Sequence, residues 1–147
     1  LNNSRVSLTN EFVSSLQVAR SEAATRNQRV TMCASGNGTS CGTASAWKNG
    51  WIIFNDADLS GTPNGDELII KDVRSDGEID IIPETFTGSV TYRPNGRAMA
   101  ATIAENSGQF TFCDRRGAAH ARVLMVGGNG RPQLSETAAD GSQPECD

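Results

Sequence analysis

Residues 1–26 of the chain read LNNSRVSLTNEFVSSLQVARSEAATR, and this stretch decides the fold. Apolar side chains recur in it at helical spacing, while arginine, glutamate and serine side chains fall on the other side. The stretch contains no glycine or proline, and Asn27 is a plausible helix stop because asparagine tolerates a left-handed backbone. One amphipathic helix is therefore predicted, with an apolar face formed by Leu1, Leu8, Phe12, Leu16, Ala19 and Ala23.

The rest of the chain is predicted to be rich in β-strands. Short runs of β-branched and aromatic residues alternate there with turn residues. Pro94-Asn95-Gly96 predicts a tight hairpin, since both central residues of a type I′ turn need positive φ. One helix followed by antiparallel strands is an α+β pattern, in which Leu8, Phe12 and Leu16 would pack the helix on the sheet. The expected strands cover residues 29–34, 51–55, 67–73, 78–82, 89–93, 97–103, 108–113 and 121–126.

The length of 147 residues predicts a single globular domain, residues 1–147. It is expected to consist of a helix over 1–26, a β-rich head over 29–131 and a polar tail over 132–147. The sequence opens at Leu1 already inside a helical pattern, as a sequence does when it is cut within a helix, so a further segment is expected upstream. No stretch within the chain approaches the roughly 18 consecutive apolar residues that a membrane span needs.

Four cysteines, at positions 33, 41, 113 and 146, indicate two disulfides. Their spacing fits neither a Cys-x-x-Cys motif nor a zinc pattern. Four cysteines allow three pairings, and sequence alone does not choose among them. We favour Cys33 with Cys41, which bracket a Gly/Ser/Thr loop, and Cys113 with Cys146, which would tie down the polar tail. Disulfides predict an oxidising compartment.

Charge is segregated along the chain. Residues 55–84 carry nine acidic and two basic side chains, a net −7, whereas residues 91–131 carry six arginines and two acids, a net +4. The whole chain is at −4. Such asymmetry can steer the docking of subunits or attract a polyanion, and it is equally typical of solvated faces that merely differ.

Three motifs suggest chemistry that their surroundings do not favour. Residues 56–67 match a twelve-residue calcium loop, but strand-like flanks and Pro63 favour a plain turn and leave calcium binding open. Residues 38–42 satisfy the Gly-x-Ser-x-Gly pattern without the strand and helix it requires, and the single histidine, His120, has no assignable partner. Residues 127–130 are expected to form a turn. No catalytic residue, metal site or cofactor is predicted, so the protein is not expected to be an enzyme.

Several blocks of the sequence resemble one family. They are residues 16–23, residues 26–31 followed by Cys33, residues 51–54 followed by Asp56, residues 112–117, and Gly130-Arg131. Together they resemble the minor pilins and pseudopilins of the FimT/FimU and GspH type, and the resemblance spans nearly the whole chain. It implies a pilin-like fold whose hydrophobic N-terminal helix, processed and methylated, anchors the subunit in the inner membrane before assembly into an extracellular pilus.

The resemblance also implies a structural role. Minor pilins of this type are expected to prime assembly of the type IV pilus with other minor pilins and the major pilin, supporting twitching motility and adhesion. One alternative is DNA binding for DNA uptake, but where DNA-binding relatives carry a Gly-Arg-x-Arg motif this chain has Gly130-Arg131-Pro132-Gln133, so binding of DNA is not expected. The other alternative is a pseudopilin of a type II secretion system, which shares the fold.

Overall fold

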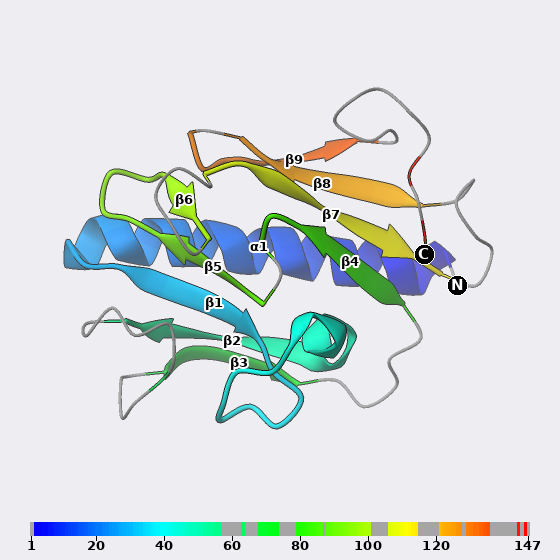
Figure 1. The fold of residues 1–147 in the computed structure, drawn as a ribbon, viewed down its shortest axis with the longest axis horizontal. Coiled ribbons are helices and arrows are strands. Elements are labelled where there is room, and N and C mark those ends of the chain that lie inside the picture. The colour runs from blue at the N-terminus through cyan, green and yellow to red at the C-terminus, as the bar shows by residue number, and fades with distance from the viewer. Residues whose placement is uncertain are drawn as a thin grey trace.

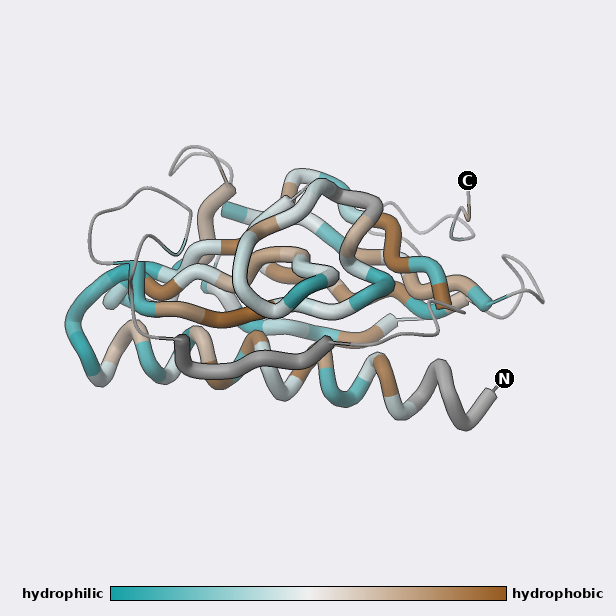
Figure 2. The backbone as a smooth tube through the Cα atoms, turned by 90° about the horizontal axis from the view of Figure 1, so that it is seen from below, coloured by the Kyte–Doolittle hydropathy of each residue, from teal (hydrophilic) through white to brown (hydrophobic). Residues whose placement is uncertain are grey.

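The computed structural model describes residues 2–56, 63, 68–73, 79–86, 88–100, 106–114, 121–127, 129–135, 144 and 146. It contains one long helix and two antiparallel sheets (Figure 1). Turned by 90°, the molecule shows the helix as a layer of its own along one face of the strands (Figure 2). The predicted α+β fold is confirmed. No helix formed by the described residues is long and apolar enough to cross a lipid bilayer.

Helix α1 spans Asn2–Arg26, in agreement with the predicted helix. Its end is set by Asn27, whose φ of 54° lies in the left-handed region. The amide of Gln28 then donates to the carbonyl oxygen of Ala23 at 3.3 Å, a Schellman-type closure that satisfies one of the last helical carbonyls. The predicted stop at Asn27 is therefore confirmed.

The first sheet has the strand order β3-β2-β1-β5-β6 and the second the order β4-β7-β8-β9. All neighbouring strands run antiparallel. The bounds in the first sheet are β1 Val30–Ala34, β2 Gly50–Asn55, β3 Leu68–Val73, β5 Ser89–Tyr92 and β6 Ala98–Met99. Those in the second are β4 Asp80–Glu84, β7 Gly108–Cys113, β8 Arg122–Val126 and β9 Pro132–Ser135.

The structure departs from the expected strands in three places. Strand β9 lies in the segment predicted as polar tail, where it pairs with β8 at the edge of the second sheet. An edge strand needs no apolar alternation, and Gln133 and Leu134 are both exposed, so the sequence pattern missed it. Strand β4 begins two residues later than expected, and β6 is shorter than the predicted 97–103, of which residues 101–103 lie outside the described residues. A 3-10 helix, η1 (Ala44–Asn49), was not predicted.

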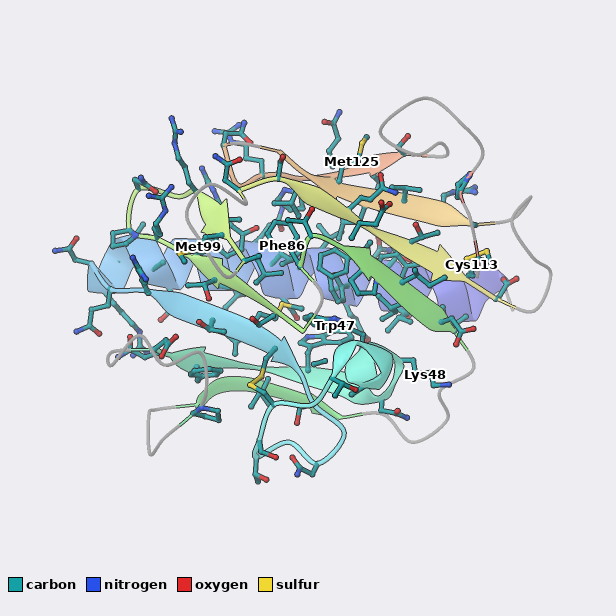
Figure 3. The ribbon with its side chains drawn as sticks, in the orientation of Figure 1. Trp47, Lys48, Phe86, Met99, Cys113 and Met125 are labelled. Atoms are coloured by element: carbon teal, nitrogen blue, oxygen red, sulfur yellow. A yellow bond between two sulfur atoms is a disulfide. The ribbon has the colours of Figure 1, made fainter. Side chains whose placement is uncertain are left out.

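The core lies between α1 and the two sheets. Phe12 is fully buried, and its ring meets the rings of Trp47, Trp51, Phe110 and Phe112 with centroids 4.8–5.4 Å apart. Figure 3 shows Trp47 on η1 and Phe86 both in the middle of the molecule. Such a cluster of aromatic rings combines a large apolar area with favourable edge-to-face contacts. It joins helix, η1 and both sheets into one core.

Two disulfides cross-link the described part of the chain. Cys33 bonds to Cys41 and Cys113 bonds to Cys146, which are the pairings favoured from the sequence. The first ties β1 to the loop that leads into η1, and the second ties the end of β7 to the last residues of the chain.

Candidate functional site

The apolar face of α1 is buried against the head. Leu8, Phe12 and Leu16, expected to pack the helix on the sheet, are exposed by only 4%, 0% and 0%. They belong to one core cluster with residues of both sheets. The indole Nε1 of Trp51 on β2 donates a hydrogen bond to Ser15 Oγ at 2.9 Å, so the buried polar group of the helix is satisfied from the sheet. This face fixes the helix to the head.

The opposite face of α1 is open and polar. The exposed side chains of the described helix are Ser7, Asn10, Glu11, Ser14, Gln17, Ser21, Ala24 and Thr25, all polar except Ala24. A helix with one buried and one open face can support the head from one side and meet another element on the other.

Two hairpin turns that share the triplet Asn-Gly-Arg lie beside the C-terminal half of the helix. Asn95-Gly96-Arg97 joins β5 to β6, and Asn129-Gly130-Arg131 joins β8 to β9. In each turn the asparagine Oδ1 accepts a hydrogen bond at 3.0 Å from the backbone amide of the arginine. The two glycines have φ of 88° and 81°, in the region that side chains avoid. We call this pair the twin turns.

The twin turns touch one another although they belong to different sheets. A Cβ on Gly130 would overlap the carbonyl oxygen of Gly96, so only glycine permits this approach. The hydroxyl of Tyr92, at the end of β5, donates to the carbonyl oxygen of Gly130 at 2.7 Å. Burial raises the pKa of this phenol well above its usual value, while the nearby Arg20 guanidinium opposes the shift. The neutral phenol is therefore a fixed donor across the seam between the sheets.

Arg20 joins both turns to the helix. Its Nε donates to the carbonyl oxygen of Gly96 at 3.0 Å, and its Nη2 donates to that of Asn129 at 3.3 Å. Hydrogen bonds to a charged group are stronger than those between neutral groups. A Cβ on Gly96 would lie 2.9 Å from Arg20 Nη2, so this glycine also makes room for the clamp.

A groove of about 570 Å³ lies between the helix and the twin turns. Its helix side is lined by Gln17, Ser21 and Ala24, and its turn side includes Asn95 and Arg131. Arg20 and Arg131 are the charged side chains among the residues that line it, so the groove is polar and positive. The turns, the clamp and the groove together are the candidate functional site.

The sequence did not single out this site. It indicated the Asn-Gly hairpin at residues 94–96 and a turn at 127–130, and a turn is present at both places. The predicted type I′ geometry is wrong, because Gly96 has a positive φ and Asn95 does not, and the amide of Gly96 closes the turn on the carbonyl oxygen of Arg93 at 2.9 Å. The proximity of the two turns was not predictable, because the contact joins residues from separate sheets. The repeated Asn-Gly-Arg triplet is the one signal that could have drawn attention to the pair.

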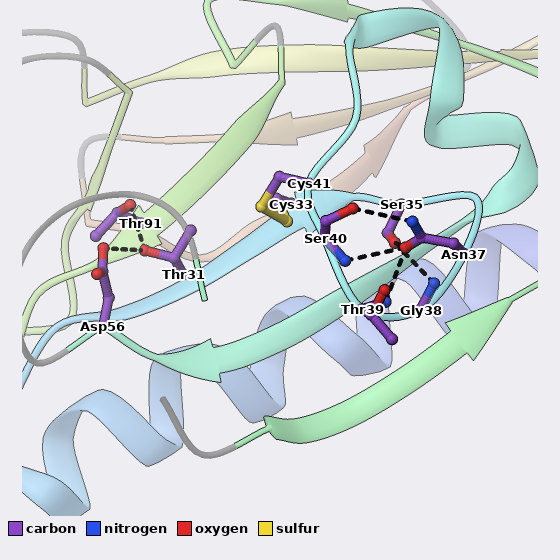
Figure 4. The surroundings of a disulfide bond; sticks show 10 residues. All are labelled: Thr31, Cys33, Ser35, Asn37, Gly38, Thr39, Ser40, Cys41, Asp56 and Thr91. Atoms are coloured by element: carbon purple, nitrogen blue, oxygen red, sulfur yellow. Dashed lines mark hydrogen bonds between the residues drawn. A yellow bond between two sulfur atoms is a disulfide. The ribbon is translucent and has the colours of Figure 1, made fainter. Parts of the chain in front are cut away.

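Two of the other motifs take structural roles in the described residues. Asp56, the first position of the possible calcium loop, is buried and its Oδ2 accepts a hydrogen bond from Thr31 Oγ1 at 3.0 Å (Figure 4). Thr31 Oγ1 also lies 2.8 Å from Thr91 Oγ1. The carboxylate therefore belongs to a small polar cluster formed by residues of β1 and β5 and the residue that follows β2. Most of the remaining loop lies outside the described residues, and among those described no three potential metal ligands come together.

The Gly-x-Ser-x-Gly segment forms a small cross-linked loop. Asn37 Oδ1 accepts hydrogen bonds from the amides of Thr39 and Ser40, and Asn37 Nδ2 donates to Ser40 Oγ (Figure 4). Cys41 is oxidised in its disulfide. The segment is thus a rigid turn and not a strand-to-helix elbow. His120 lies outside the described residues.

Comparison with known proteins agrees with this architecture. Two crystal structures of the type IV minor pilin FimU from Pseudomonas aeruginosa strain PAO1 are similar. The first has a TM-score of 0.69 at 22% identity and covers 92% of this chain and 97% of its own. The second has a TM-score of 0.66 at 20% identity and covers 95% of each chain. At these identities the likeness concerns the fold.

No curated protein matches the sequence. The family described as "Type II transport protein GspH" matches residues 8–130, which include most of α1, both sheets up to β8, and the second of the twin turns as far as Gly130. The chain therefore belongs to the GspH family of pilin-like proteins.

Proposed function

We propose that this protein is a minor pilin that helps to prime assembly of the type IV pilus and becomes part of it, supporting twitching motility and adhesion. The observation that carries the proposal is that α1, in a member of the GspH family, has one face buried against the head and the other face exposed. One face of the helix is held by Leu8, Phe12 and Leu16, and the other is open to meet neighbouring subunits.

The proposed mechanism is mechanical and involves no catalysis. A subunit in a filament has to transmit load between its helix and its head without changing their angle. Three features support this role: the aromatic cluster around Phe12, the Trp51–Ser15 hydrogen bond, and the Arg20 clamp. They connect the helix to both sheets along its length. In this proposal the chain forms a single head domain and its partners are other minor pilins and the major pilin.

The proposed location is the periplasmic face of the inner membrane before assembly and the extracellular pilus afterwards. The disulfides Cys33–Cys41 and Cys113–Cys146 support it, because such bonds persist in oxidising compartments.

A deletion strain tests the pilus against the type II secretion system, which shares the fold. We expect loss of the gene to reduce surface pili and twitching, and the wild-type gene to restore both. Secretion of proteins through the type II system should be unchanged in the same cells. Normal piliation with lost secretion would contradict the proposal and assign the chain to the secretion machine.

DNA binding is the second candidate function, because Arg97 and Arg131 are both exposed and belong to two turns that touch each other. Phosphate contacts made by these arginines would weaken steeply with salt. Duplex DNA titrated into the purified protein at low and high salt separates the two functions. We expect no saturable binding at either salt concentration. Salt-sensitive binding that Arg97→Gln and Arg131→Gln remove would favour DNA uptake instead.

A further inference from the structure

The twin turns present two arginines in the same local geometry. Arg97 and Arg131 each follow an Asn-Gly pair, each donates its backbone amide to the asparagine Oδ1, and each is exposed. Among the described residues neither arginine forms an ion pair with its side chain. Arg131 lines the groove, and Arg97 stands on the neighbouring turn, next to the groove residues Asn95 and Gly96.

These arginines stand on rigid supports. The Gly96–Gly130 contact, the Tyr92 hydroxyl and the Arg20 clamp all fix the backbone from which they project. Because the turns are ordered before binding, a partner does not have to supply the entropy cost of ordering them. A guanidinium held in this way suits a carboxylate, which accepts two parallel hydrogen bonds from its fork.

None of the described residues that line the groove carries a carboxylate. Gln17, Ser21 and Ala24 supply its helix side, and the acids near this end of α1 are engaged or buried: Glu22 pairs with Arg26 at 2.8 Å and Asp56 bonds to Thr31. Arg20 already donates to two carbonyl oxygens. Within the described part of the chain, Arg131 in the groove and Arg97 on the neighbouring turn have no acidic partner, and their positive charge suits an external acidic group.

We infer that the twin turns and the groove beside them form a docking surface for a carboxylate-bearing segment of a neighbouring protein subunit. The inference rests on the proposed function, which places such subunits around the head. A short acidic segment fits better than a long polyanion. The chain as a whole carries −4 and residues 55–84 carry −7, so a polyanion that extended beyond the groove would meet repulsion.

Site-specific photo-crosslinking in piliated cells tests the docking surface. A photoreactive amino acid takes the place of Gln17, inside the groove, and a matched control takes the place of Lys48 on η1, toward the opposite end of the molecule from β6 (Figure 3). We expect the probe at position 17 to capture a peptide of another pilin subunit that contains aspartate or glutamate. The probe at position 48 should not capture that peptide.

Charge variants show whether the arginines hold the segment. Arg97→Gln combined with Arg131→Gln should lower the yield of the position-17 crosslink about tenfold, since it removes two charge-assisted contacts. Lys48→Gln, which removes one charge elsewhere, should leave the yield unchanged. Because all three side chains are at least partly exposed, unfolding midpoints equal to that of the wild type will show that the variants are folded.

Three results would overturn the inference. One is incorporation of the chain into pili without any crosslink at position 17, and another is an equal yield in the double variant. Crosslinking to DNA at position 17 would replace the protein partner by a nucleic acid. Absence of the wild-type chain from pili would instead refute the proposed function, and the docking surface with it.

Discussion

At the scale of single residues, Tyr92 shows how the seam between the sheets is held. It is the only tyrosine in the chain, so its ionisation can be followed without interference from another phenol. Burial raises its pKa above the ordinary value of about 10, and Arg20 only partly offsets that shift. The folded protein therefore keeps the phenolic proton at a pH where the unfolded chain loses it.

The folded protein should therefore lose stability at alkaline pH. The stabilising contribution of Tyr92 is fully present below about pH 10 and is lost as the pH rises above it. We expect no tyrosinate absorbance in the native protein until it unfolds, and a free energy of unfolding that falls with increasing pH in this range. In Tyr92→Phe the fall should be shallower. Ionisation of Tyr92 near pH 10 in the folded protein would contradict this account.

Gly130 is the residue on which the contact between the twin turns depends. Gly130→Ala would place a side chain at a positive φ and against the Gly96 carbonyl oxygen. Backbone strain and overpacking together predict a loss of about 3 kcal/mol or more in the free energy of unfolding. Urea denaturation measures it.

Gly127→Ala is the matched control in the same turn. Among the described residues, its new Cβ would meet Asn129 Oδ1 alone, at an ordinary 3.5 Å. The expected change is within about 0.5 kcal/mol. Similar losses in the two variants would mean that the Gly96–Gly130 contact is not what holds the turns together.

At the scale of secondary-structure elements, the hold of α1 on the head depends on Phe12. Phe12→Ala removes a fully buried ring from contact with four others, so we expect a loss of about 3–5 kcal/mol. Ser14→Ala, on the exposed face of the same helix, should change stability by no more than about 0.5 kcal/mol. Thermal unfolding of both variants gives the comparison. A Phe12→Ala variant as stable as Ser14→Ala would show that the helix is not held by this cluster.

The elements also show what sequence could predict. Helix α1 and its stop at Asn27 depend on local patterns, and those patterns were sufficient. Most strands were found from their β-branched and aromatic residues, although β1, β2 and β7 are buried at nearly every position and do not alternate. Strand β9 was missed because none of its side chains is buried and its strand character comes from pairing with β8. The Arg20 clamp was missed for a different reason. It links residues 76 and 109 positions apart, and a single sequence does not show which distant residues meet.

At the scale of the whole molecule, the two disulfides differ in the length of chain they close. Cys33 and Cys41 are separated by 8 positions and Cys113 and Cys146 by 33. In the chain-entropy model these loops correspond to about 2.6 and 3.8 kcal/mol. Replacing Cys113 and Cys146 by alanine should therefore lower the urea midpoint more than replacing Cys33 and Cys41. The reverse order would show that native contacts of the short loop, and not chain entropy, set the stability of the molecule.

The whole molecule is a GspH-family protein in which a long helix, one face open, is fixed to two sheets at several points. Charge is distributed unevenly over it, with arginines at the twin turns and acids concentrated in residues 55–84. A structural subunit needs both features: a rigid connection between helix and head, and surfaces that differ from one another. The central claim is that this subunit is built into a type IV pilus.

The most direct test of that claim is mass spectrometry of pili sheared from cells that produce the protein. We expect peptides of this chain in the purified pilus fraction, in small amounts relative to the major pilin. The same peptides should be absent when the major pilin gene is deleted. Pili that are abundant and free of this chain, while the chain remains with the cell, would contradict the account.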